Sequence, residues 1–137
     1  MIDISFFSPK NHEIIDFIDD VIFYDKFVFE EENGHLSIED SYVQKWENVS
    51  KLFDFIFKGQ IVQITSIYKD SSLKIYDLSK FKNNILTFED LENNYQKWIQ
   101  ISGQENTMDE YGMFIGIIGF FERNQNSKNV FARVKSR

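Results

Sequence analysis

The chain has 137 residues, of which 42% are hydrophobic and 27% are charged, with 22 acidic and 15 basic side chains and a net charge of −7. This length fits one domain around one core, and so large an apolar share excludes an intrinsically disordered chain. No cysteine is present, which excludes disulfides and thiolate metal sites and favours a reducing compartment.

The first 40 residues predict a strand, a helix and a hairpin. Residues 2–7 are typical of a short strand, and the following Ser8-Pro9 is typical of a helix start. The helix, predicted to run to about residue 22, places isoleucine, phenylalanine and valine on one side and carboxylates on the other. Residues 24–31 alternate as a strand does, and Asn33-Gly34 favours a tight turn into a return strand at residues 36–38.

The middle of the chain predicts two further amphipathic helices separated by a second hairpin. Apolar residues recur with helical spacing from Ser41 to Lys58. Residues 61–68 and 73–78 are typical of two strands joined by a polar turn. A third helix is expected from about Leu91 to Ser102, with Gly103 ending it.

The C-terminal third leaves one segment ambiguous. After a polar loop at residues 104–110, residues 111–122 and 129–134 predict a terminal hairpin. A buried helix is the alternative for residues 111–122, because short apolar runs do not separate the two structures. The predicted fold class is α+β, with about three amphipathic helices packed on a mostly antiparallel sheet, in a single domain spanning residues 1–137.

No pattern in the chain meets the requirements of a catalytic, cofactor or metal site. His12-Glu13-x-x-Asp16 has the spacing of a zinc helix motif but lacks its second histidine, and His35 is typical of an exposed turn residue. Glu30–Glu32 lacks the ligand spacing of a calcium loop, and the glycines after residue 110 match no nucleotide-binding loop. We therefore expect no enzyme, no cofactor and no metal.

Charge is unevenly distributed along the chain. The first 40 residues contain eleven acids and two lysines, whereas the last fifteen contain five basic residues and no acid. An acidic domain repels nucleic acid and attracts basic proteins. The basic C-terminal residues are therefore expected to pair with the acidic half of the same fold and not with nucleic acid.

With no signal peptide and no spanning segment, a cytoplasmic location away from membranes is expected. The predicted partner-binding residues are Glu13, Asp16, Asp19, Asp20, Glu30, Glu31, Glu32, Glu39 and Asp40.

This profile, acidic, free of cysteine, rich in phenylalanine and without a site motif, resembles that of immunity proteins from bacterial toxin–immunity pairs, such as those of contact-dependent growth inhibition. The resemblance implies a non-catalytic protein whose partner is a basic cognate toxin domain, often a nuclease. Two other functions fit the residues: a general interaction or scaffold domain, and a phage-encoded inhibitor of a bacterial nuclease. An enzyme is the least favoured class.

Overall fold

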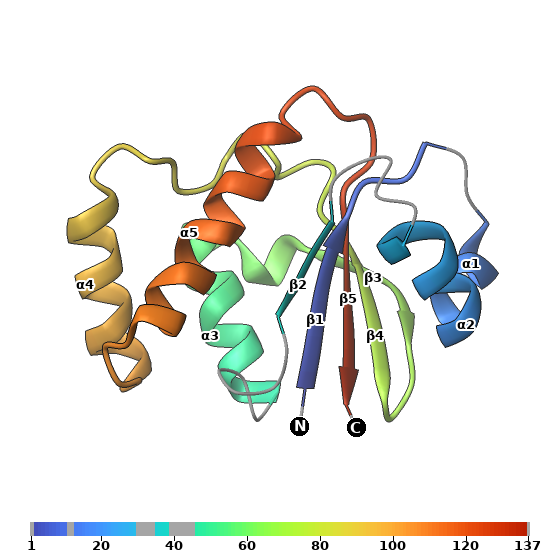
Figure 1. The fold of residues 1–137 in the computed structure, drawn as a ribbon, viewed down its shortest axis with the longest axis horizontal. Helices are drawn as coiled ribbons and strands as arrows, with labels where there is room; N and C mark the ends of the chain where they lie inside the picture. The colour runs from blue at the N-terminus through green and yellow to red at the C-terminus, as the bar shows by residue number, and fades with distance from the viewer. Residues whose placement is uncertain (1, 11–12, 30–34, 39–45, 137) are drawn as a thin grey trace.

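A computed structural model describes residues 2–10, 13–29, 35–38 and 46–136. These residues form a single α+β domain, which confirms the predicted fold class. Within them, antiparallel strands form one sheet in the spatial order β2-β1-β5-β4-β3, so that the first and last strands lie side by side at its centre (Figure 1). The strands are β1 (Ile2–Phe7), β2 (His35–Ile38), β3 (Thr65–Lys69), β4 (Leu73–Asp77) and β5 (Phe131–Ser136).

Helices lie on both faces of this sheet and give the domain three layers (Figure 1). One face carries the longer helices α3 (Trp46–Ile56) and α5 (Met108–Arg123), and α4 (Leu91–Ser102) lies outside them, farther from the sheet. The opposite face carries α1 (Ile14–Ile18) and α2 (Asp20–Phe23), which continue into a π-helix at Tyr24–Phe29.

Alternation along the strands divides the apolar side chains between two cores. In β1, Phe6 faces the longer helices, and its ring centroid lies 6.0 Å from that of Phe53 in α3. The next residue, Phe7, faces the other way, and its ring centroid lies 5.0 Å from those of both Phe17 and Phe23. The smaller core therefore holds α1 and α2 on the sheet largely through three aromatic rings.

The elements with strong local signals are confirmed. Helices α3 and α4 lie within the ranges predicted for them, and β3 and β4 form the predicted hairpin. The strand predicted from Ile61 starts only at Thr65, because Ile61–Gln63 forms a 3-10 turn first. Gly103 ends α4 with a φ of 69°, a left-handed conformation that glycine adopts without steric cost.

The preferred strand at residues 111–122 is wrong, and the helical alternative is correct. This segment belongs to α5, which starts after Thr107, whose hydroxyl accepts a hydrogen bond from the backbone N–H of Glu110. Its buried residues recur at spacings of three and four, as a helix requires. Strand β5 therefore pairs with β1 and β4 instead of with residues 111–122. The buried apolar residues of α5 are Met113, Phe114, Ile117, Ile118, Phe120 and Phe121.

The strand predicted at residues 24–31 is also wrong where the structure describes it. Tyr24–Phe29 is a π-helix that continues directly from α2, and at their junction Phe23 is buried with the Tyr24 ring packed against its own. The return strand β2 is confirmed, but it pairs with β1, with Leu36 opposite Phe6. The Asn33-Gly34 turn lies outside the described residues.

The helix predicted to run to residue 22 is broken at Asp19. The backbone there is extended, with φ −76° and ψ 121°, and the Asp19 carboxylate caps α2 by accepting from the Ile22 N–H at 3.0 Å. The break rotates the second helix, so the predicted apolar face is not continuous. Ile14 and Val21 are 45% and 75% exposed, contrary to the expectation of a buried stripe.

Candidate functional site

Asp16 was expected on the exposed polar side of the first helix, and this placement is wrong. The residue is buried, its carboxylate accepts a hydrogen bond from the Glu13 backbone N–H at 3.1 Å, and it forms an ion pair with Lys26 at 3.2 Å. Burial of a carboxylate requires such compensation. Asp16 therefore stabilises the start of α1.

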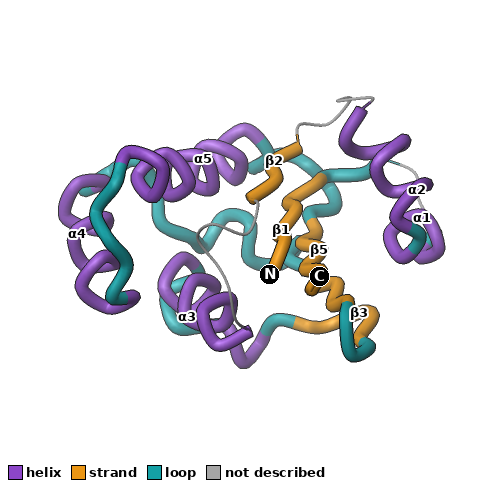
Figure 2. The backbone as a smooth tube through the Cα atoms, turned by 60° about the horizontal axis from the view of Figure 1, so that its bottom comes forward, coloured by secondary structure: helices purple, strands orange, loops and turns teal. Residues whose placement is uncertain are grey.

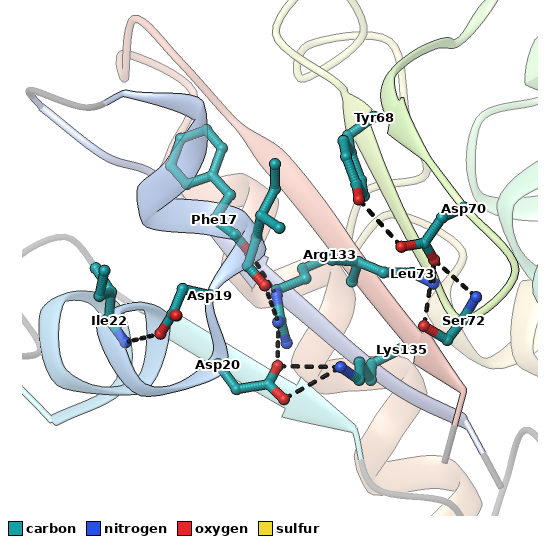
Figure 3. A network of polar contacts seen from close by, with 11 residues as sticks. Phe17, Asp19, Asp20, Ile22, Tyr68, Asp70, Ser72, Leu73, Arg133 and Lys135 are labelled. Carbon is teal, nitrogen blue, oxygen red and sulfur yellow. Dashed lines mark hydrogen bonds and ion pairs between the residues drawn. The ribbon is translucent and has the colours of Figure 1, made fainter.

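Asp20 is held by two basic residues of the C-terminal strand. Its carboxylate is bonded by the Arg133 guanidinium and by the Lys135 ammonium, the latter at 3.1 Å (Figure 3). Burial opposes the charged form of Asp20, but the hydrogen bonds from Arg133 and Lys135 outweigh it and hold the pKa below its ordinary value. The expectation that the basic C-terminal residues pair with the acidic half of the fold is confirmed here.

Arg133 anchors the bend between α1 and α2 to the sheet. Only 3% of the residue is exposed, and its Nε donates to the Phe17 carbonyl at 2.6 Å while Nη2 donates to the Ile18 carbonyl at 3.2 Å (Figure 3). The guanidinium also lies 4.6 Å from the centroid of the Phe23 ring. These contacts satisfy backbone carbonyls left open where α1 ends.

The structure therefore divides the nine predicted partner-binding residues into three groups. Asp16 and Asp20 are occupied by internal ion pairs. Glu13 and Asp19 are exposed at the ends of α1. The other five, Glu30, Glu31, Glu32, Glu39 and Asp40, lie outside the described residues.

A second acidic region, whose acids were not among the predicted partner-binding residues, surrounds the junction of α4 and α5. Residues 86–112 contain six acids and one lysine, a local excess that averaging over residues 41–122 conceals. Among the described residues none of these acids forms an ion pair, and five are exposed. The exposed acids are Glu89, Asp90, Glu92, Glu105 and Asp109.

The same junction contains a cavity of about 270 Å³. The loop after Gly103 turns back alongside α4, as Figure 2 shows, and brings the start of α5 against the first half of α4. The Tyr95 hydroxyl donates to Asn106 Oδ1 at 2.8 Å, and the rings of Tyr95 and Tyr111 meet edge to face with centroids 4.7 Å apart. The cavity is lined by Glu92, Tyr95 and Gln96 from α4, and by Asn106, Thr107, Met108 and Tyr111.

The sixth acid of this region, Glu110, is buried and is not among the residues that line the cavity. Trp98 Nε1 donates to Glu110 Oε1 at 2.9 Å, which fixes α4 against α5. Burial raises the pKa of Glu110 above its ordinary value, and the hydrogen bond from Trp98 only partly offsets this.

The raised pKa of Glu110 predicts a specific pH dependence of stability. The folded state holds the proton more tightly than the unfolded state, so this residue's contribution falls as pH rises from about 4.5 through the raised value. We expect Glu110→Gln, which keeps an oxygen acceptor for Trp98, to raise the melting temperature at pH 7 and to leave it nearly unchanged at pH 4. Thermal melts of both proteins across this range check the prediction, and parallel curves would contradict it.

In the part of the chain that the structure describes, no three histidine or acidic side chains come together as a metal site would require. His12 and the side chain of His35 fall outside that description. No described helix combines the length and the apolar character needed to cross a bilayer. Comparisons with protein-family models, with curated proteins and with solved structures found no match to this chain, so its function is inferred from its own residues.

Proposed function

We propose that this protein is a non-catalytic acidic inhibitor that binds and neutralises a basic protein. The observation that carries the proposal is a surplus of exposed carboxylates that form no ion pair among the described residues. Concentrated charge of one sign lowers stability by self-repulsion and attracts surfaces of the opposite sign. Seven of these carboxylates gather at two places, the ends of α1 with Glu13 and Asp19, and the α4–α5 junction with Glu89, Asp90, Glu92, Glu105 and Asp109.

The partner class that fits best is a bacterial toxin domain, most of all a nuclease, which makes the protein an immunity protein. A nuclease must hold a phosphodiester in a positively charged cleft. A rigid negative surface that enters this cleft excludes the substrate and associates quickly under electrostatic steering. The two aromatic cores on either side of the sheet give the domain the required rigidity.

The test is binding to the protein encoded immediately upstream of this chain's gene, because toxin and immunity genes of such pairs are adjacent. We expect a 1:1 complex that abolishes the toxin's nuclease activity. The association rate should fall about tenfold or more between 50 and 500 mM NaCl, since salt screens the steering charges. Stopped-flow association with a tryptophan signal measures this rate.

The charge variants for this test follow from the structure. Asp16 and Asp20 are unsuitable for reversal because their internal ion pairs would be lost together with any partner contact. The triple reversal of Glu30, Glu31 and Glu32 to lysine tests the predicted N-terminal contribution and should slow association. A neighbouring protein that is acidic, or an association rate indifferent to salt, would contradict the proposal.

A further inference from the structure

We propose that the α4–α5 cavity receives an arginine or lysine side chain of the basic partner. This inference rests on the proposed function and assigns it a specific site. The occupant is a single cationic side chain at the centre of the contact, held by an aromatic ring and a carboxylate.

The chemistry of the cavity wall favours a cation. Tyr111 supplies a half-buried aromatic ring, and Tyr95, which is only 2% exposed, supports that ring edge to face. Glu92 supplies an exposed carboxylate among the same lining residues. A cation over an aromatic ring gains electrostatic attraction, which increases when water is excluded, and a carboxylate adds a charge-assisted hydrogen bond. No lysine or arginine is among the described residues that line this cavity.

A second cavity in the same molecule shows this chemistry with its cation in place. It has a volume of about 230 Å³ between α3 and β4, and Trp46, Tyr76 and Glu47 are among its lining residues. There the chain supplies its own cation, because Lys74 Nζ lies 4.1 Å from the centroid of the Trp46 ring. The α4–α5 cavity likewise has an aromatic ring and a carboxylate in its wall, but no lysine is among the described residues that line it.

The charge around the cavity strengthens this preference. Glu105 and Asp109 are exposed beside the lining residues, whereas Lys97 is the only basic residue between positions 86 and 112. The N-terminus of α5 would by itself attract an anion. Asp109 and Glu110 in its first turn oppose that effect, and Thr107 already caps the Glu110 N–H.

The size and rim of the cavity favour a protein side chain over a small ligand. Its volume lies just below the range of roughly 300–1,000 Å³ that is usual for small-molecule sites. Met108 lies at the cavity and is 90% exposed, although methionine is an apolar residue that is enriched at protein interfaces. A flexible thioether of this kind adapts its contacts to a partner surface.

The first experiment uses a probe that needs no partner. The peptide N-acetyl-Gly-Arg-Gly-amide is titrated into the isotopically labelled protein and compared with the same peptide carrying citrulline, the neutral isostere of arginine. We expect backbone amide shifts confined to residues 92–96 and 106–111, with affinity at least about fivefold lower for the citrulline peptide. Equal affinity for both peptides, or shifts elsewhere, would overturn the proposal.

The second experiment uses the partner itself. We expect Glu92→Gln and Tyr111→Leu each to raise the dissociation constant about tenfold, mainly through faster dissociation. The matched control Glu122→Gln removes an exposed charge from the last turn of α5 and should change it less than about twofold.

These experiments distinguish a wrong cavity assignment from a wrong proposed function. If the parent protein binds a basic partner and the cavity variants match Glu122→Gln, the cavity assignment is wrong and the proposed function stands. If no basic partner binds the parent protein, the proposed function fails. Melting temperatures of all variants confirm that each remains folded.

Discussion

We expect the Phe53→Ala variant to lose about 3–5 kcal/mol of unfolding free energy, the usual cost of emptying a buried phenylalanine site. The side chain of Phe53 is 0% exposed and packs in the core between the α3 backbone and the sheet. Its ring centroid lies 6.0 Å from that of Phe6, 5.9 Å from that of Phe57 and 5.6 Å from that of Tyr76. Alanine would leave three rings without their shared partner and would open a cavity that the strands cannot close.

Urea unfolding at constant pH measures this loss as a shift of the midpoint at an unchanged slope. Phe88→Ala is the matched control, because Phe88 is the same residue type but 44% exposed, and about 1–2 kcal/mol is expected there. Equal losses in the two variants would show that α3 does not bury its apolar face as the structure places it.

The parts of the fold that were predictable are those whose signals are local. Helix α4 has apolar residues at helical spacing and a glycine at its end, and both appear in the structure where expected. Helix α3 and the β3–β4 hairpin follow in the same way, since α3 has apolar residues at helical spacing and the two strands of the hairpin are neighbours in sequence. Their periodicity is decided before any tertiary contact is known.

The elements that were wrongly predicted depend on contacts distant in sequence. Residues 24–29 alternate like a strand, but the edge of the sheet beside β1 is occupied by β2. The buried residues of α5 lie on one face, but the opposite face carries Ile115 and three glycines in place of the polar stripe that marks an amphipathic helix. The Thr107 cap, followed by Asp109 and Glu110 in the first turn, was a local signal that could have indicated a helix start there.

The sequence indicated the charge of the partner at the candidate site but not where the site lies. The excess of acid indicates a basic partner at the level of composition, and pairing between the chain's acidic and basic ends was expected and is seen at Asp20. The cavity was not predictable, because Glu92 and Tyr111 come together only where the loop after Gly103 turns back along α4. The periodicity of residues within one helix contains no information about the path of the loop that follows it.

We expect Arg133→Met to lose about 2–4 kcal/mol of unfolding free energy, with the loss concentrated at α1 and α2. Methionine keeps much of the apolar stem of the arginine but leaves the carbonyls of Phe17 and Ile18 without their donors. The estimate lies below that for a fully buried ion pair, because the Asp20 side chain is 50% exposed and can be solvated again.

Lys135, which also forms an ion pair with Asp20, provides the control for Arg133. Lys135→Met removes the other ion pair of Asp20 but no bond to a backbone carbonyl, and about 0–1 kcal/mol is expected. Hydrogen exchange separates local from global effects: in Arg133→Met the amides of α1 and α2 should exchange much faster, while those of β1 and β5 follow only the global loss. If the two variants lose equal stability and exchange alike, then the aromatic contacts of Phe7 with Phe17 and Phe23 hold this layer, and the buried guanidinium contributes little to its attachment.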